Sequence, residues 1–220
     1  MTQPRQRVQR VITLLGSTSV GKSTLCTRFI GKEFSNEYEP TIRNLFQLKK
    51  IQNGTEYDLQ IQDTAGLERH AQINGHYINS DGFILVYSTT DYQSFETVID
   101  IFNSLADELN REIPLVLIGN KSDLIDKRKV PYASGESLAR KWRAAFYETS
   151  ALDGKNVKNS FEALLDLIDP PVQSTISTQN GSINKKLSSN VNASHSSNHY
   201  NPPGLTTTSS NSNKNSCIIS

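Results

Sequence analysis

Gly16-Ser17-Thr18-Ser19-Val20-Gly21-Lys22-Ser23 is the most informative segment of this chain. It has the spacing G-x-x-x-x-G-K-[ST], which is typical of a phosphate-binding loop. An apolar run, residues 11–15, precedes it, and residues 24–30 after it have a helical pattern. This order places successive backbone N–H groups at the N-terminus of a helix, where they face an anion. The loop therefore predicts phosphate binding, although the loop alone leaves open a plain glycine-rich turn before a helix.

Three residue types in and after this loop suit a magnesium-bound polyphosphate. Lys22 supplies a positive charge to the outer phosphates, and the Ser23 hydroxyl is a ligand for Mg²⁺. Asp63-Thr64-Ala65-Gly66 follows a strand that we expect to end at Ile61. P-loop nucleotide hydrolases hold their Mg²⁺ with a carboxylate at this place, and Gly66 leaves a backbone N–H for the terminal phosphate.

A second motif indicates which base is bound. Asn120-Lys121-Ser122-Asp123 follows the predicted strand 115–119. The Asp123 carboxylate can accept from both N–H donors of the guanine edge, which adenine does not present. Ser150-Ala151 follows the next strand, and the Ala151 N–H suits the guanine carbonyl. The sequence therefore predicts GTP or GDP, and it makes a P-loop ATPase or kinase improbable.

Short apolar runs alternate with helical patterns, which predicts a mostly parallel α/β sheet with helices on both faces. The runs are residues 11–15, 83–87, 115–118 and 145–147. Residues 45–51 and 56–61 flank Asn53-Gly54, a pair typical of tight hairpin turns. We therefore expect six strands, of which one edge strand is antiparallel.

The last helix has the clearest pattern, because one apolar stripe runs along it behind Asn156 as the predicted cap. Pro170-Pro171 should end it. The stripe consists of Val157, Phe161, Leu164, Leu165 and Ile168. We interpret Trp142, Phe146 and Phe161 as packing residues without a catalytic role.

Composition limits the remaining possibilities. The 220 residues carry a net charge of +1, which gives no reason to expect nucleic acid as a partner. Residues 171–220 contain no Asp or Glu and are rich in Ser, Thr and Asn, so we expect a disordered tail. The two cysteines form neither a disulfide framework nor a zinc spacing. We expect neither secretion nor a transmembrane segment, because the chain shows no signal peptide and no apolar stretch of about 20 residues.

These motifs, together with residues 38–42 (Tyr-Glu-Pro-Thr-Ile), appear in the order and spacing of the Ras-type small GTPases, which the chain resembles over residues 8–169. Within that family it looks most like the Rheb branch, through residues 83–88 and 142–146, with Ras and Rap next. The resemblance implies a nucleotide-binding domain, residues 8–170. An extension, residues 1–7, precedes it, and the tail, residues 171–216, leads to a terminal motif, residues 217–220.

The resemblance also implies a set of roles. Phe34 covers the guanine, Tyr38 covers the phosphates, and Thr41 completes the Mg²⁺ shell with Ser23 and Asp63. Lys22, Thr41 and Gly66 are the expected catalytic residues. The expected nucleotide-binding set is Gly16, Ser19, Val20, Gly21, Lys22, Ser23, Thr24, Phe34, Tyr38, Thr41, Gly66, Asn120, Lys121, Asp123, Ser150 and Ala151. Effectors would bind residues 38–46 and 66–78, and an exchange factor (GEF) and a GTPase-activating protein (GAP) would control a monomeric switch.

Leu67 departs from the family pattern, because Ras-like proteins normally carry here a Gln that orients the attacking water. An aliphatic side chain can neither hold nor polarise water, so we predict slow GTP hydrolysis. Another residue or a group supplied by the GAP can take over this role, and that alternative stays open. So does a second function, a largely GTP-bound interaction module with negligible hydrolysis.

Three further positions differ from Ras. Thr18 stands where glycine is usual and would crowd an incoming arginine finger, which argues against a typical Ras GAP. Arg43 reverses a charge in the effector segment and should change the choice of partner. Leu152 replaces a lysine beside the base, so we expect weaker nucleotide binding but not its loss.

Cys217-Ile218-Ile219-Ser220 fits C-a-a-X, and the final Ser indicates a farnesyl group added to Cys217 by farnesyltransferase. A single lipid chain binds membranes only marginally, and the tail has no second cysteine and few lysines. We therefore expect reversible attachment to the cytoplasmic face of endomembranes or the plasma membrane.

Overall fold

The computed structural model describes residues 7–32, 43–67, 77 and 79–171. The strands are β1 (Arg7–Leu15), β2 (Arg43–Gln52), β3 (Thr55–Thr64), β4 (Gly82–Ser88), β5 (Leu115–Asn120) and β6 (Ala145–Glu148). The helices are α1 (Lys22–Phe29), α2 (Tyr92–Leu109), α3 (Tyr132–Trp142) and α4 (Val157–Ile168), with a short 3₁₀ turn, η2 (Ile125–Lys127). The six strands of the described residues lie in the order β2-β3-β1-β4-β5-β6, and among them only the edge strand β2 runs antiparallel to its neighbour. This confirms the predicted fold class.

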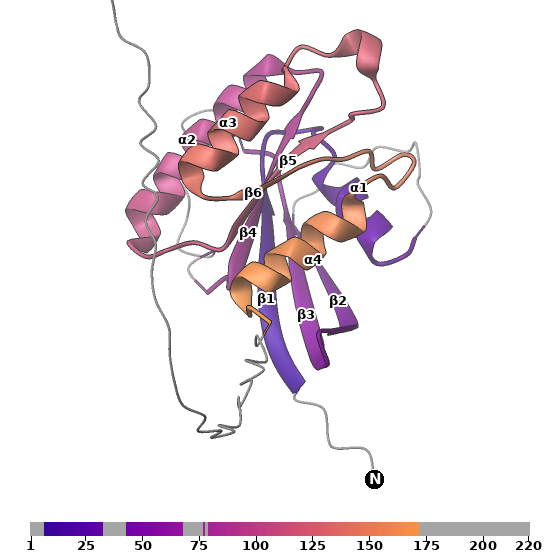
Figure 1. The fold of residues 1–220 in the computed structure, drawn as a ribbon, viewed down its shortest axis with the longest axis vertical. Coiled ribbons are helices and arrows are strands. Elements are labelled where there is room, and N and C mark those ends of the chain that lie inside the picture. The colour runs from indigo at the N-terminus through magenta and orange to yellow at the C-terminus, as the bar shows by residue number, and fades with distance from the viewer. Residues whose placement is uncertain (1–6, 33–42, 68–76, 78, 172–220) are drawn as a thin grey trace, which may run out of the picture. The chain divides into compact units, whose positions relative to one another are not determined.

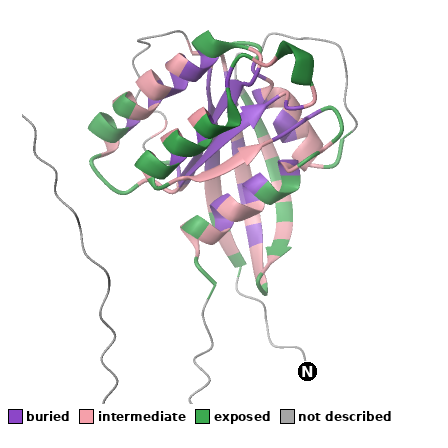
Figure 2. Cartoon of the chain, turned by 45° about the horizontal axis from the view of Figure 1, so that its top comes forward, coloured by how far each residue is buried: buried purple, intermediate pink, exposed green. Residues whose placement is uncertain are grey.

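The central strands are buried on both faces, which explains their nearly continuous apolar sequences. Phe83, Leu85 and Tyr87 of β4 contact one hydrophobic cluster with α2 and α3, whereas Ile84 and Val86 contact another with α1 and α4. The two pairs of helices therefore cover opposite faces of the sheet (Figure 1). Burial concentrates in the central strands, and the helices expose their outer sides (Figure 2).

The predicted hairpin forms between β2 and β3. Asn53 and Gly54 both have positive φ, 50° and 81°, as a tight turn of this kind requires. The strands extend beyond the predicted limits, and β3 continues through Asp63 to Thr64. Asp63 therefore lies within the regular sheet rather than in a loop.

The last helix keeps its predicted apolar stripe, but the predicted cap is wrong in one respect. Asn156 occupies the cap position, yet its side chain makes no capping hydrogen bond. Its backbone is left-handed, with φ of 57°, and its side-chain N–H donates to the Glu148 carbonyl at 2.9 Å. The residue therefore joins the start of α4 to β6 instead of capping the helix.

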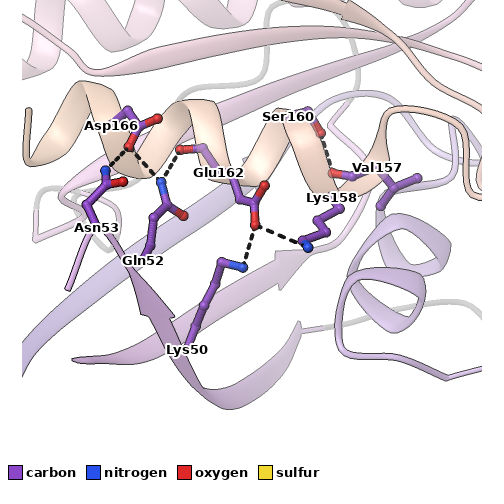
Figure 3. A network of polar contacts seen from close by, with 8 residues as sticks. All are labelled: Lys50, Gln52, Asn53, Val157, Lys158, Ser160, Glu162 and Asp166. Atoms are coloured by element: carbon purple, nitrogen blue, oxygen red, sulfur yellow. Dashed lines mark hydrogen bonds and ion pairs between the residues drawn. The ribbon is translucent and has the colours of Figure 1, made fainter. Parts of the chain in front are cut away.

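A network of polar contacts fastens the β2–β3 hairpin to α4 (Figure 3). The Lys50 ammonium pairs with the Glu162 carboxylate at 2.7 Å. The Gln52 and Asn53 amides both donate to Asp166, at 2.7 and 2.9 Å. The edge of the sheet is thus tied to a helix that lies more than 100 residues later.

None of the helices in the described residues combines the length and the apolar character that crossing a bilayer requires. The predicted tail, from residue 172 onwards, lies outside the described residues.

Candidate functional site

The phosphate-binding loop connects the end of β1 to the start of α1, as predicted. Two positions of the loop require glycine because their φ is positive, 150° at Gly16 and 100° at Gly21. Close neighbours also leave no room for a side chain at either position. A side chain at Gly16 would overlap the Val86 carbonyl, and one at Gly21 would overlap the Asn120 amide. The loop is therefore packed against the ends of β4 and β5, which fixes its position.

Lys22 is folded back onto this loop. Its side-chain nitrogen donates to the Gly16 and Ser17 carbonyls, both at 2.9 Å, and only 5% of the residue is exposed. Burial lowers its pKa to about 8, although the nearby Asp63 carboxylate acts in the opposite direction. The ammonium group thus lies inside the loop, where bound phosphates could replace the two carbonyls as partners.

Asp63 is fully buried at the carboxyl end of β3. Within the described part of the chain, neither of its carboxylate oxygens accepts a hydrogen bond of ordinary geometry. Burial raises its pKa, and the nearby Ser23 hydroxyl and Lys22 ammonium partly offset this rise. A buried carboxylate beside a hydroxyl suits Mg²⁺, which prefers oxygen ligands and often takes only one or two from the protein. Asp63 and Ser23 therefore fit the predicted metal site.

Asn120 joins the three segments expected to bind nucleotide. It is buried at the end of β5, and its side-chain N–H donates to the Val20 carbonyl of the loop at 2.9 Å. Its side-chain oxygen accepts from the Thr149 hydroxyl at 3.0 Å, directly before Ser150-Ala151. Lys121 adds a second link, because its ammonium donates to the Ser19 carbonyl at 2.7 Å. The base-recognition motif and the phosphate loop are thus held together in a fixed arrangement.

The remaining predicted residues of this region lie close by in the chain and in the sheet. Ser150 and Ala151 are buried after β6, and Thr24 lies half-buried in the first turn of α1. Asp123 is half-buried, two residues before the start of η2. Leu152 exposes 52% of its surface. These positions all lie at the carboxyl edge of the parallel strands, where open α/β sheets bind their ligands.

Ala65-Gly66-Leu67 lies directly on the phosphate loop. The Leu67 N–H donates to the Gly16 carbonyl at 3.0 Å. A side chain at Gly66 would overlap the backbone and hydroxyl of Thr18. The Leu67 side chain packs against the hydrophobic cluster under α2. Segment 65–67 is thus in van der Waals contact with the loop.

Several predicted residues lie outside the described residues: Phe34, Tyr38, Thr41 and Cys217. The predicted effector segment is described only from residue 43, and the second switch only at residues 66, 67 and 77. Conversely, the sequence interpretation missed Thr149. Its place immediately before Ser150-Ala151 was the available signal, but its partner lies 29 residues away.

Comparison with known proteins identifies the class that this fold and site define. Residues 11–169 match the Ras family. The chain belongs to the Ras family of small GTPases, whose members bind guanine nucleotide and Mg²⁺ and hydrolyse GTP. Proteins of this family interact in general with exchange factors, activating proteins and effectors.

The similar proteins include several Rheb proteins. The GTP-binding protein Rheb of Homo sapiens is 40% identical over 162 residues, 73% of this chain and 88% of that protein. The GTP-binding protein Rheb homolog of Drosophila melanogaster is 40% identical over 163 residues, 73% of this chain and 90% of that protein. The GTP-binding protein rhb1 of Schizosaccharomyces pombe is 38% identical over 162 residues, 73% of this chain and 88% of that protein. The chain is thus a Rheb-like GTP-binding switch protein, which confirms the predicted resemblance.

Proposed function

We propose that this chain is a membrane-attached, slowly hydrolysing Ras-type GTPase whose nucleotide state switches effector binding in signal transduction. The single observation that carries the proposal is the position of Asn120. It connects the base-recognition motif, the phosphate loop and the segment before Ser150-Ala151 through two hydrogen bonds. A site built in this way recognises base and phosphates together, which is what a guanine-nucleotide switch requires.

In this proposal each part of the site has a separate task. The loop N–H groups and Lys22 bind the phosphates, and Asp123 with Ala151 recognises the guanine. Ser23 and Asp63, with Thr41, hold Mg²⁺, which neutralises charge on the phosphates when it is bound. The Gly66 N–H receives the terminal phosphate, and Phe34 and Tyr38 cover the bound nucleotide.

The packing of Leu67 supports slow hydrolysis. Its side chain contacts the core, and its N–H is bound to Gly16, so neither group is available to orient a water. A second function follows from the same observation: a largely GTP-bound interaction module that scarcely turns over. The nucleotide carried by the purified protein separates the two.

We further propose the partners that the sequence suggested. Effectors bind residues 38–46 and 66–78 of a monomer under control of a GEF and a GAP, and Thr18 argues against a GAP with a typical arginine finger. Farnesyltransferase modifies Cys217, and the lipid attaches the protein reversibly to the cytoplasmic face of endomembranes or the plasma membrane. The domain of residues 8–170 carries the switch, and residues 171–216 link it to the anchor.

The test is to release the nucleotide from the freshly purified full-length protein and to identify it by chromatography. Mostly GDP supports the switch, and mostly GTP supports the interaction module. Adenine nucleotide would contradict both. A fluorescent fusion compared with its Cys217→Ser variant tests the anchor separately, because identical distributions would rule out prenylation at that residue.

A further inference from the structure

The Leu67 side chain is aliphatic and packs against the core, and its N–H is bound to Gly16, so in the proposed function another polar group would have to orient the water. Lys22 is assigned to the phosphates, and the Thr64 hydroxyl donates to the Leu14 carbonyl at 2.8 Å. Asp63 is fully buried and fits the metal site. These side chains have other tasks.

Thr18 differs from all of them. Its side chain is exposed, and its hydroxyl makes no hydrogen bond to any residue within the described ranges. The three atoms nearest to a side chain built at Gly66 all belong to Thr18, namely its N, Cα and Oγ1. The Thr18 hydroxyl therefore lies directly beside Gly66, the residue whose N–H we assign to the terminal phosphate.

We propose that the Thr18 hydroxyl orients the attacking water and so takes over, only in part, the role of the glutamine that Leu67 replaces; hydrolysis stays slow, but not zero. The inference rests on the proposed function, because it places the terminal phosphate at Gly66. A hydroxyl can accept a hydrogen bond from the water while a lone pair of the water oxygen points at the phosphorus. Thr18 is a catalytic residue in this account, since its hydroxyl contacts the attacking water directly.

The reaction is balanced without any further reagent. The water oxygen forms a bond to the γ-phosphorus, and the bond from that phosphorus to the β,γ-bridging oxygen breaks. The bridging oxygen leaves with its electron pair as part of GDP, and the hydrogens of the water leave with the released phosphate. Thr18 begins and ends the cycle as a neutral hydroxyl.

The test is single-turnover GTP hydrolysis by the full-length protein with Mg²⁺, in variants that separate the shape of Thr18 from its hydroxyl. Thr18→Val keeps the shape and removes the hydroxyl, whereas Thr18→Ser keeps the hydroxyl. We expect Thr18→Val to be slower by about tenfold or more, and Thr18→Ser to stay within about threefold of the original protein. Thr27→Val is the matched control, because its hydroxyl is bound to the Thr24 carbonyl of its own helix.

GTP and GDP affinities of every variant are measured alongside, and we expect them to be unchanged. A Thr18→Val variant as fast as the original protein would overturn the inference, and so would a Thr18→Ser variant as slow as Thr18→Val. Failure of the original protein to bind guanine nucleotide would instead contradict the proposed function, so the two failures are distinguishable.

Discussion

The Leu67 N–H donates a hydrogen bond of 3.0 Å to the Gly16 carbonyl, and the same carbonyl accepts a second hydrogen bond from the Lys22 ammonium. This shared acceptor links two groups that, in the proposed function, respond to phosphate. In that function, Lys22 would contact the phosphates of the bound nucleotide, and a movement of Leu67 would also move its neighbour Gly66. The proposed function would thereby couple the state of the loop to the start of the predicted second switch, residues 66–78.

Gly66→Ala should separate these segments, because the added methyl would overlap the N, Cα and hydroxyl of Thr18. Residues 65–67 would have to leave the loop and lose the bond to Gly16. We expect the affinity for GTP to fall by about tenfold or more relative to GDP, since only GTP has the phosphate assigned to Gly66. Competition of both nucleotides against a fluorescent analogue measures this ratio.

The double variant Thr18→Gly with Gly66→Ala serves as its control. It removes the hydroxyl from the overlap but leaves the Thr18 backbone atoms in place, so it should not restore the ratio. A Gly66→Ala protein with the original ratio of affinities would show that the contact is unimportant.

The lowered pKa of Lys22 predicts how nucleotide affinity depends on pH. Burial lowers its pKa from 10.5 to about 8 in the ligand-free protein, and bound phosphates should raise it again. Binding therefore takes up a proton above pH 8, and GDP affinity should fall by about tenfold for each further pH unit. Titration calorimetry at several pH values measures both effects, and a proton uptake of zero at pH 9 would exclude this role of Lys22.

The same lowered pKa affects stability with the opposite sign. Between about pH 8 and 10.5 the unfolded chain holds the Lys22 proton and the ligand-free folded protein does not. The contribution of Lys22 to the free energy of unfolding should therefore rise with pH in this window and stay constant below it. Lys22→Met removes this contribution, so the difference in stability between variant and original protein should change across the window.

Asn120→Ala should destabilise the folded protein by about 2–3 kcal/mol, because it leaves the Val20 carbonyl and the Thr149 hydroxyl without their buried partner. Bound GDP should also dissociate faster. Ser122→Ala, in the same motif, is the control. The Ser122 hydroxyl is buried without a partner among the described residues, so we expect a change within about 0.5 kcal/mol. Urea unfolding at one saturating GDP concentration compares them, and equal losses would contradict the account.

The contact between Lys50 and Glu162 should contribute measurably to the attachment of the hairpin to α4. The two side chains expose only 15% and 30% of their surface, so solvent screens the pair weakly. A double-mutant cycle with Lys50→Met and Glu162→Gln should give a coupling free energy of about 1 kcal/mol. The Arg140–Glu136 pair, exposed by 77% and 48%, is the control and should give about 0.3 kcal/mol or less. Equal couplings would show that burial of the pair is irrelevant.

Much of the fold follows from local sequence patterns. Continuous apolar runs such as residues 83–87 identify strands that helices cover on both faces, and Asn53-Gly54 identifies the hairpin turn. The last helix follows from its apolar stripe. Asn156 has the right residue type for a cap, but the sequence does not reveal that its backbone is left-handed. Local composition therefore predicts the element and not its first hydrogen bond.

The candidate site was predictable as a set of motifs but not as an arrangement. The bond from Asn120 to the Val20 carbonyl spans 100 residues and ends on a backbone atom, which leaves no trace in the side-chain pattern. The sequence identified Leu67 as a departure from the family pattern, because it lacks the polar amide of the usual Gln. Its contact with the core depends on how residues 65–67 cross the loop, and only the folded chain provides that information.

The most direct test of the account is the rate of single-turnover GTP hydrolysis before and after Leu67→Gln. The Leu67 side chain is only partly buried, so a glutamine can turn from the core cluster towards the phosphates. The account predicts a slow original protein and an increase of about tenfold or more in the variant. Equal rates in the two proteins, at equal GTP affinity, would contradict the claim that Leu67 limits how fast this switch resets.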